Sequence, residues 1–402
     1  MHLCKPLTEE TQIYTNLQCI PAEWDAFLPD CHSLKTRELG ALELSGPKDI
    51  QFAYLTISRY GKVIGLVSLQ VVEIKAEDIQ SNVWKSVVLN HLKDLIFCKP
   101  RYLLVCGNAF RNDLPGFYFK EKEDEALIYE ILKAFDAKNP FKIKFAGWMI
   151  KDWEADLKQA EGYGFKSIQQ DLQMEMKVPS DWKILDDYFF NLSKKYLQRA
   201  RKIRSSLTGI TVKSLDESAI RFHLPELEIL YRNVVKQQAF HLLALPVSYF
   251  LQMKQSLGER FEMHGYFLED KLVAFSSLIH HSDNGLEIYY IGLDYVANEK
   301  HNLYFNLLFD GLETAILHQK KLLKLGRTGF DAKASLGALP VEGKHLIRMK
   351  RGLPSMVFQY LTNWYQSLEK PAWKNRNPLI VKPVILENQN KSDLANHELL
   401  VR

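Results

Sequence analysis

The segment of residues 286–338 constrains the fold most strongly. A strand-like run at 286–295, rich in β-branched and aromatic residues, leads into a polar loop at 297–302 and a long apolar helix at 303–318. A second apolar strand follows at 321–325. Strand, loop, helix and strand in this order predict a βαβ-like unit. In such units the loop meets a helix N-terminus, where free N–H groups favour anions. We therefore expect a phosphate- or carboxylate-bearing substrate there.

The composition is that of a folded globular chain with room for two domains. The chain has 402 residues, of which 47% are hydrophobic and 25% charged, as in typical globular proteins. A formal net charge of +4 fits an anionic ligand or an anionic membrane surface and does not require nucleic acid, and we expect no DNA partner. The five cysteines form no CxxC pair, which favours a reducing compartment.

Neither a membrane-spanning segment nor a signal peptide is expected. No run of about 20 apolar residues, the length of a spanning helix, occurs in the sequence. The first residues, MHLCKP, lack the apolar core of a signal peptide. These features predict a cytoplasmic protein whose membrane contact, if it has one, is peripheral and at the inner face.

The same order of elements occurs twice along the chain. In the first half a hairpin at 52–69 precedes a strand, a helix and a strand between residues 101 and 148. The second half repeats this order, with a hairpin at 262–279 ahead of the βαβ-like unit at 286–325. The two halves share no close sequence identity, and the repeated order predicts an internal structural duplication.

The seam between the two halves is predicted near Pro179. Proline ends the preceding strand, and Ser180 or Asp181 can cap a new helix. We predict one domain at residues 1–179 and a second at 180–385, followed by a loosely ordered tail at 386–402.

Several short motifs resemble a known family. A hairpin whose turn reads RYGK (59–62), followed by strand, helix and strand and by GYGF at 162–165, is similar to the GNAT acyltransferase fold. Two tandem copies joined by a basic helical segment resemble the Fem family and the Fem-related, peptidoglycan-associated GNAT-like N-acyltransferases. In the second half the likeness rests on YIGLDY (290–295) before Asn302, on GRT (326–328) before Lys333, and on the basic residues 194–204.

The resemblance implies an α/β fold with a mixed sheet, built from two tandem GNAT-like acyl-CoA N-acyltransferase domains. It implies that the second domain is catalytic and that no cofactor is tightly bound. One feature departs from the family pattern: GNAT loops that wrap the pyrophosphate of acyl-CoA contain glycine, whereas residues 297–302 contain none. Residues 112–116 of the first half also differ from that pattern. Fem-type proteins lack the usual loop too, so acyl-CoA, acyl carrier protein and charged tRNA stay open as the donor.

Two residues at the end of the strand at 286–295 are the catalytic candidates. Acyl transfer to an amine needs a proton acceptor and a proton donor. We predict Asp294 as base or amine binder and Tyr290 as proton donor, because a period of two places them on one face. Glu287 lies three residues before Tyr290, which on a regular strand is the opposite face. The alternative is that Tyr290 packs in the core and Asp294 caps the following turn.

A second group of residues is predicted to bind an anionic part of a substrate. Arg327 follows a buried strand and a glycine, which suits a fixed guanidinium fork, and Lys333 lies about one turn further on. A structural ion pair is the alternative for these two. Asn302 and His241 complete the set, His241 lying at a helix end where capping or core packing is the alternative. His280 and His281 are expected on the surface, and no metal site is predicted.

A dense basic cluster lies ahead of the second half and is predicted to share one broad face of a helix. It consists of Lys194, Lys195, Arg199, Arg201, Lys202 and Arg204. Such a face binds tRNA phosphates, lipid headgroups or CoA phosphates. The alternative is a solvated helix face with no ligand.

These observations predict an N-acyltransferase that moves an activated acyl group from acyl-CoA or acyl carrier protein onto an amine of a small molecule or amino lipid. One alternative is a Fem-like transferase that uses aminoacyl-tRNA and acts on a peptidoglycan precursor. The other alternative is a non-catalytic GNAT-like binding protein. The expected partners are an acyl donor and an amine acceptor, with tRNA and an anionic membrane surface left open.

Overall fold

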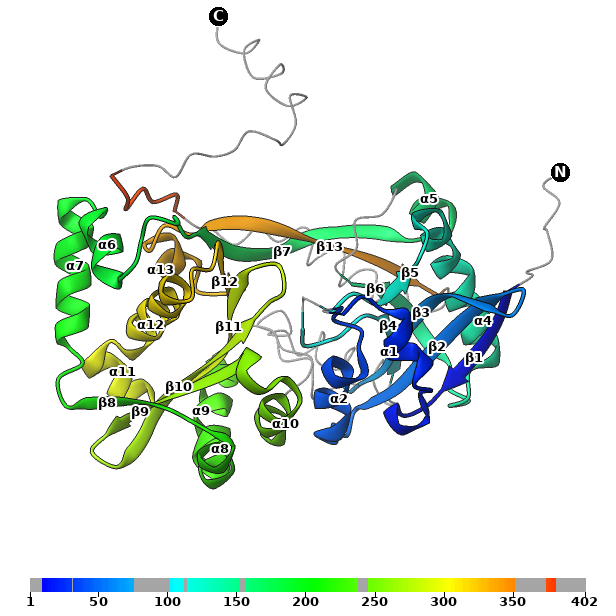
Figure 1. Cartoon of the computed structure of the whole chain (residues 1–402), viewed down its shortest axis with the longest axis horizontal. Coiled ribbons are helices and arrows are strands. Elements are labelled where there is room, and N and C mark those ends of the chain that lie inside the picture. Colours follow the sequence, from blue (N-terminus) through cyan, green and yellow to red (C-terminus); the bar gives the residue numbers. More distant parts are fainter. Residues whose placement is uncertain are drawn as a thin grey trace, which may run out of the picture.

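A computed structural model describes the chain over residues 9–30, 32–75, 101–111, 114–151, 157–237, 245–350 and 374–380. It has two lobes joined along one edge by long strands (Figure 1). No helix among these residues is long and apolar enough to cross a membrane.

The first half of the chain contributes seven strands. They are β1 (Glu9–Tyr14), β2 (Ile50–Arg59), β3 (Lys62–Ile74), β4 (Arg101–Cys106), β5 (Phe117–Phe119), β6 (Phe145–Ile150) and β7 (Lys166–Lys177). The helices described in this half are η1 (Leu17–Cys19), α1 (Glu23–Phe27), α2 (Thr36–Leu44), η4 (Lys122–Leu127), α4 (Ile128–Lys138) and α5 (Leu157–Gly162).

The second half contributes the remaining strands, β8 (Ile210–Ser214), β9 (Phe261–Leu268), β10 (Lys271–His280), β11 (Gly285–Leu293), β12 (Leu322–Gly326) and β13 (Leu339–Met349). Its described helices up to β9 are α6 (Leu185–Phe190), α7 (Lys194–Ser205), α8 (Glu217–Phe222), α9 (Leu224–Gln237), α10 (Ser248–Leu257) and η5 (Gly258–Arg260). Later come α11 (Tyr295–His301), α12 (Leu303–Leu317) and α13 (Phe330–Ala334).

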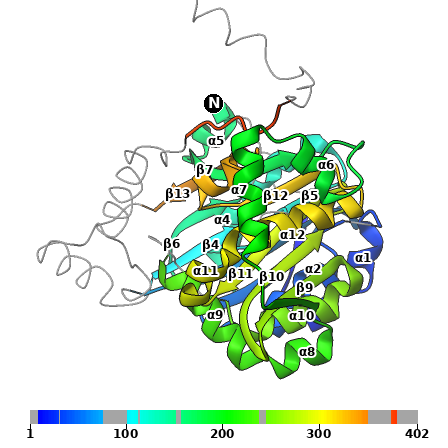
Figure 2. The same ribbon diagram turned by 90° about the vertical axis from the view of Figure 1, so that its left-hand side faces the viewer.

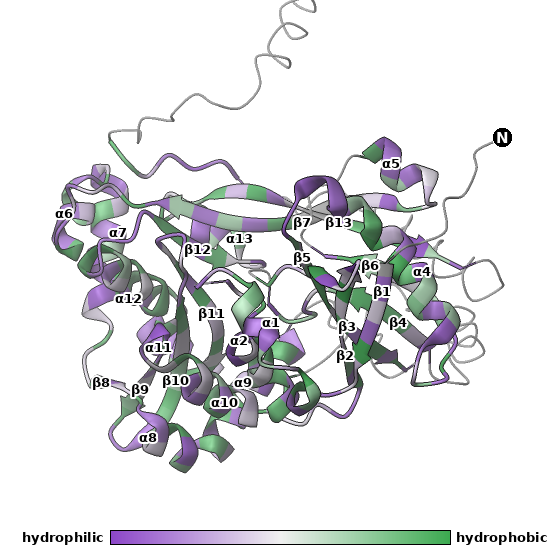
Figure 3. Cartoon of the chain, turned by 45° about the vertical axis from the view of Figure 1, so that its right-hand side comes forward, coloured by the Kyte–Doolittle hydropathy of each residue, from purple (hydrophilic) through white to green (hydrophobic). Residues whose placement is uncertain are grey.

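Both predicted hairpins are confirmed. β2 and β3 pair antiparallel up to Arg59 opposite Lys62, with Tyr60 and Gly61 in the turn at positive φ. β9 and β10 pair up to Leu268 opposite Lys271. Most residues of β2 and β3 are buried, and Figure 3 shows these strands as largely hydrophobic. A strand buried on both faces reads as a continuous apolar run.

The two halves exchange a strand. All described strands except β5 lie along one continuous sheet in the order β1-β2-β3-β4-β6-β13-β7-β12-β11-β10-β9-β8. β13 of the second half pairs with β6 of the first, and β7 of the first half pairs with β12 of the second. β7 and β13 also pair with each other, from Leu339 opposite Glu175 to Ile347 opposite Lys166. In Figure 1 these two strands run together along the top of the molecule, from one lobe to the other.

The strand order confirms the predicted α/β fold with a mixed sheet, built from two tandem units of like order. Each unit runs hairpin, strand, helix, strand, and then shares the β7–β13 ladder with the other unit. The predicted boundary at residue 179 falls just after β7, whose end pairs with β12. The domain limits at 1–179 and 180–385 therefore stay a prediction, because each unit's part of the sheet contains a strand from the other stretch of sequence.

Helices cover both faces of the part of the sheet formed by β8 to β12, which we call the second sheet. α12 and α7 cover one face, where Leu312 and Ile288 belong to a core cluster (Figure 2). α9 and α10 cover the other face, where Phe250 and Phe275 are fully buried. This second cluster continues into the first half through Trp24, and Ser248 Oγ donates to Ser45 O at 3.0 Å. The two halves thus share a hydrophobic core as well as a sheet.

The pairing of β6 with β13 leaves no room for a side chain at Gly147. A Cβ there would lie 2.8 Å from Arg348 O and 2.5 Å from Met349 Sδ. We predict that Gly147→Ala lowers the free energy of unfolding by about 1–3 kcal/mol, the usual cost of overpacking, as measured by chemical denaturation. Gly162→Ala is the matched control, because a Cβ at Gly162 meets nothing within 4 Å. Equal stability of the two variants would contradict this account of the exchanged strand.

Candidate active site

The sheet opens between β11 and β12. These parallel strands pair only from Gly285 with Leu322 to Glu287 with Lys324. Beyond Glu287, β11 continues beside β10 as far as Leu293 without a described partner on its other edge. The corresponding strands of the first half, β4 and β6, stay paired from Tyr102–Phe145 to Cys106–Ile150. Only the second unit therefore has this opening among the described strands.

A β-bulge shapes β11 at the opening. Ile288 lies opposite Leu278 and Ile291 opposite Ser276, so Tyr289 and Tyr290 together face Ser277. The Ser277 hydroxyl accepts from Tyr290 N at 2.9 Å and donates to Tyr290 O at 3.0 Å. The extra residue of a bulge interrupts the alternation of side chains. The two tyrosine rings consequently lie side by side, with centroids 4.4 Å apart.

The bulge brings Tyr289 and Tyr290 of β11 into a cluster with Tyr231 of α9 and Tyr249 of α10. Tyr249 Oη and Tyr289 Oη lie 2.9 Å apart, and the Tyr231 ring meets the Tyr290 ring edge-on at 5.7 Å. Burial raises the pKa of both Tyr289 and Tyr290 well above the usual value, and the neighbouring tyrosines raise it further. Both phenols are therefore protonated at neutral pH and can donate a proton or a hydrogen bond.

Two arginines, one from each half of the chain, act electrostatically on the tyrosine pair. The charge of Arg327 opposes the rise in the pKa of Tyr290, and that of Arg111 opposes the rise at Tyr289. Tyr289 Oη also donates to Phe110 O at 3.3 Å. The site thus lies where the two halves meet, and positive charge from each half acts on it.

Glu38 on α2 binds Arg111 and Arg260. The Arg111 Nη1 and Nη2 atoms each lie 3.2 Å from Glu38 Oε2, and Arg260 Nη1 pairs with Oε1. Glu38 is 2% exposed and Arg111 is 1% exposed. Sequence reasoning missed all three residues, because Glu38 is 73 positions from Arg111 and 222 from Arg260. Two guanidiniums around one carboxylate leave this cluster with an excess positive charge.

Hydrogen bonds from Lys151 and to Asn108 hold the loop that carries Arg111. Lys151 Nζ donates to Asn108 O at 2.7 Å and to Arg111 O at 2.9 Å. Asn108 Oδ1 accepts from the N–H groups of Phe110 and Arg111. The only sequence signal for this loop is the Gly107–Asn108 pair at the end of β4, where Gly107 has φ 120°.

The prediction that His280 and His281 lie on the surface is wrong. They are 9% and 8% exposed. His281 Nε2 lies 2.9 Å from Glu287 Oε2, and both side chains are buried. The negative charge of Glu287 also raises the pKa of Tyr290. A regular strand would separate Glu287 from Tyr290, but the bulge lets them act on one another.

The Lys333 side chain binds the backbone of the turn that carries Arg327. Lys333 Nζ donates to Gly326 O at 3.2 Å and to Arg327 O at 2.8 Å. Lys333 is 4% exposed, and burial lowers its pKa to about 7. Its ammonium thus holds the turn after β12, where Gly326 and Thr328 have positive φ. Of the predicted substrate-binding residues that the structure describes, Arg327 is the one whose charge acts on Tyr290.

Asp294 lies at the N-terminus of α11. Its Oδ1 accepts from Val296 N at 3.0 Å and Ala297 N at 3.2 Å, and its Oδ2 lies 3.4 Å from Lys271 Nζ. The side chain therefore serves as a helix cap, which uses one of its two carboxylate oxygens.

The expectation of a polar loop at residues 297–302 is wrong, because α11 occupies most of it. Asn302 has φ 47° between α11 and α12, and its Nδ2 donates to Ser206 Oγ at 3.2 Å. Tyr304 N donates to Asn298 Oδ1 at 2.8 Å. N–H groups at the start of both helices thus already have acceptors, which weakens the predicted anion site there. His241 lies outside the described residues.

The predicted basic helix is α7. Five of its six basic residues are exposed, namely Lys194, Lys195, Arg199, Arg201 and Lys202. The guanidinium of Arg199 lies 4.8 Å from the Phe305 ring centroid. Arg204 instead points to α12, where Nη1 lies 2.6 Å from Asp310 Oδ1 and Nη2 lies 3.5 Å from Glu313 Oε2. Tyr266 Oη also donates to Asp310. Arg204 therefore attaches α7 to α12, and Asp310 in turn connects α12 to β9.

Comparisons with known proteins give structural likenesses but no match by sequence. No family model matches the chain, and no curated protein matches it by sequence. Similar solved structures include FemX, with a TM-score of 0.49 and 14% identity over 88% of this chain and 100% of FemX. L-PGS from Bacillus licheniformis has a TM-score of 0.48 and 15% identity, over 86% and 96% of the two chains. A tandem GNAT protein from the clavulanic acid biosynthesis pathway has 0.47 and 10%, over 85% and 98%.

All three likenesses are weak, both in sequence and in superposition. With TM-scores below 0.5 and identities of 15% or less, they carry no argument about reaction or substrate. Any argument about chemistry has to rest on the side chains at the opening of the sheet.

The buried ammonium of Lys333 makes stability depend on pH. Burial lowers its pKa from 10.5 to about 7, so between these values the unfolded state binds a proton that the folded state lacks. The free energy of unfolding therefore rises with pH in this window, by up to about 1.4 kcal/mol per pH unit, and is insensitive to this group below it. We predict that Lys333→Met removes this rise in denaturation curves recorded from pH 6 to 10. Parallel profiles for the two proteins would contradict the lowered pKa.

The Glu38 cluster predicts a large effect of one substitution. Glu38→Ala removes the carboxylate that binds two guanidiniums, one of them fully buried. We expect the free energy of unfolding to fall by about 3–5 kcal/mol, measured by chemical denaturation. The control is Glu217→Ala, which removes an exposed i,i+4 partner of Arg221 and is expected to cost less than about 1 kcal/mol. Similar losses in both variants would refute this role of Glu38.

Proposed function

We propose that the second unit transfers an activated acyl group from a thioester to an amine, at the opening between β11 and β12. The observation that carries the proposal is the divergence of these strands beyond Glu287. It leaves the edge of β11 at residues 288–293 without a described partner strand, where backbone N–H and C=O groups other than those of Tyr290, which Ser277 binds, face an extended ligand. Such groups bind amide-containing chains by adding a strand to the sheet edge. The pantetheine arm of acyl-CoA or of acyl carrier protein is a chain of this kind.

The chemistry requires one bond to form and one to break. The amine nitrogen attacks the thioester carbonyl, the C–N bond forms, and the C–S bond breaks to release a thiolate. Tyr290, protonated at neutral pH, is proposed to donate a hydrogen bond to the oxyanion and a proton to the thiolate. Arg327 is proposed to bind an anionic group of a substrate, because its positive charge already acts on the Tyr290 phenol.

The proton released by the amine needs an acceptor. Asp294 stays a proposal for this role through Oδ2, since Oδ1 caps α11. The Glu287–His281 pair is the other proposal, favoured by the electrostatic coupling of Glu287 to Tyr290. The variants Glu287→Gln and Asp294→Asn distinguish the two proposed proton acceptors, because they change groups at opposite ends of β11.

Substitution of Tyr290 tests the proposed proton donor. In a coupled assay of thiol release from acetyl-CoA, palmitoyl-CoA or acyl carrier protein, we expect Tyr290→Phe to lower kcat by about 10²-fold or more. Tyr60→Phe is the matched control, because this tyrosine is 84% exposed and should leave kcat unchanged. A Tyr290→Phe enzyme with wild-type kcat and unchanged stability would remove Tyr290 from the mechanism.

A second candidate function is a transferase that uses aminoacyl-tRNA. The observation in its favour is the row of five exposed basic residues on α7. Contacts between basic side chains and phosphates weaken steeply with salt. Bulk tRNA that raises the unfolding midpoint at low salt, where no thioester does, would place this function first. No shift with tRNA or with any thioester would favour a non-catalytic binding protein.

A further inference from the structure

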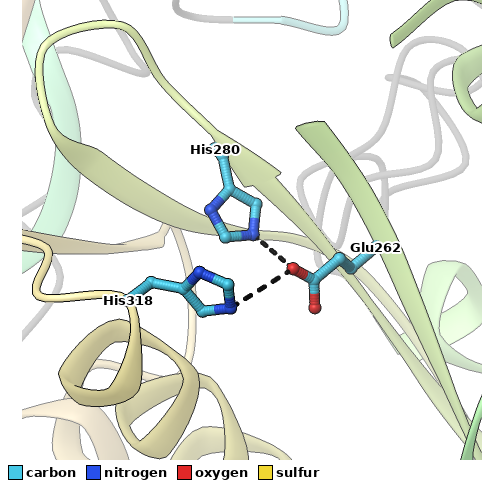
Figure 4. Close-up of side chains that lie close together, drawn as sticks. All are labelled: Glu262, His280 and His318. Carbon is cyan, nitrogen blue, oxygen red and sulfur yellow. Dashed lines mark hydrogen bonds and ion pairs between the residues drawn. The ribbon is translucent and has the colours of Figure 1, made fainter. Parts of the chain in front are cut away.

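A cluster of histidines around one carboxylate lies on the face of the second sheet opposite the tyrosines. Glu262 on β9, His280 at the end of β10 and His318 at the C-terminus of α12 converge on it (Figure 4). Their ligand atoms all lie within 4.8 Å of one another. We propose that Glu262, His280 and His318 form a binding site for a divalent transition metal of the zinc type. This inference is independent of the proposed acyl transfer.

Alternation along the strands places these side chains together. Phe261 and Met263 on β9, and Ile279 on β10, pack into the core beneath α9 and α10. Glu262 and His280 therefore face the other way, toward α12. α12 ends at Leu317, and His318 follows as its C-cap residue. Each of the three ligand residues thus comes from a different element of the fold, unlike the two members of an ordinary surface ion pair.

One of the two distances in the set is that of a hydrogen bond, and the other is close to the spacing of two metal ligands. Glu262 Oε1 lies 2.6 Å from His280 Nε2 and 3.8 Å from His318 Nε2. Ligand atoms around a tetrahedral zinc ion with bonds of about 2.0–2.2 Å are roughly 3.3 Å apart. The two measured distances lie on either side of that value, so small side-chain rotations would seat an ion. Without an ion His318 is too far from Glu262 for a hydrogen bond.

The donor set is chemically appropriate. Two imidazole nitrogens and one carboxylate oxygen are ligands that Zn²⁺ prefers, and they leave a fourth position for water. His264 Nε2 lies 3.5 Å from Glu262 Oε2, the other carboxylate oxygen. It is therefore placed to orient the carboxylate, as groups next to metal ligands commonly do.

The site also has the access and rigidity that binding requires. The His318 side chain is 53% exposed and that of His280 is 10% exposed, so an ion can enter from solvent and be held against the sheet. His280 O accepts from Arg260 Nε at 3.2 Å, and Arg260 binds Glu38. An ion here would join α12, β9 and β10, and would be connected through Arg260 to the interface between the halves.

The test uses the full chain without a histidine tag, stripped with chelator. Titration with Co²⁺, followed by visible d–d absorption, and with Zn²⁺, followed by calorimetry, should each give one ion per chain. His318→Ala should weaken binding at least tenfold, and because this side chain is exposed the variant should fold. His223→Ala is the control, since His223 also lies beside a carboxylate, 3.7 Å from Glu226, but has no third ligand residue nearby in the part of the chain that the structure describes.

Three outcomes decide the proposal. One saturable ion in the wild type and in His223→Ala, lost or weakened in His318→Ala and in Glu262→Gln, supports it, as does a Zn²⁺-dependent rise of the unfolding midpoint confined to the same proteins. No stoichiometric binding by the wild type overturns it. Equal binding by wild type and His318→Ala overturns it as well.

Discussion

The exchange of β7 and β13 between the two units is the constraint on which the rest of the structure depends. Each of these strands completes the other unit's sheet, and the ladder between them joins the two sheets into one. Every pairing in this ladder is between residues far apart in sequence, so the halves cannot be assembled independently. Since the exchange fixes how the units face one another, it also fixes where Phe110, next to Arg111, meets Tyr289 of β11.

The interface that results holds charge in a buried setting. Glu38 binds Arg111 and Arg260, and Lys151 and Asn108 hold the Arg111 loop. Buried ion pairs contribute little net stability compared with apolar packing, but the loss of one member is costly. The cluster therefore acts mainly to fix geometry. It fixes the position of Arg111 of the first half, whose charge acts on the Tyr289 phenol of the second, and so gives the first unit a part in a site that opens in the second.

Much of the fold could be predicted from the sequence, but less of the candidate active site could be predicted. Hairpins and the βαβ-like unit depend on local periodicity and turn residues, which the sequence shows directly. The strand exchange could not be read, because pairing between distant strands leaves no local signal. The bulge at Tyr289 and Tyr290 was missed for a similar reason: strand alternation assumes regular pairing, and here Ser277 faces two residues. Glu38, Arg111 and Arg260 are joined only by the folded chain. The loop expected at 297–302 is helical because Asp294 and Asn298 cap the helices there.

The central claim is that an acyl donor binds along the open edge of β11. Amide hydrogen exchange of the full-length protein, with and without a saturating thioester that raises its unfolding midpoint, tests this most directly. The account predicts slower exchange at residues 288–293, since those backbone groups gain hydrogen bonds, and no change at β4, whose strand is already paired with β6. Protection confined to other segments, or at β4 in place of β11, would contradict it.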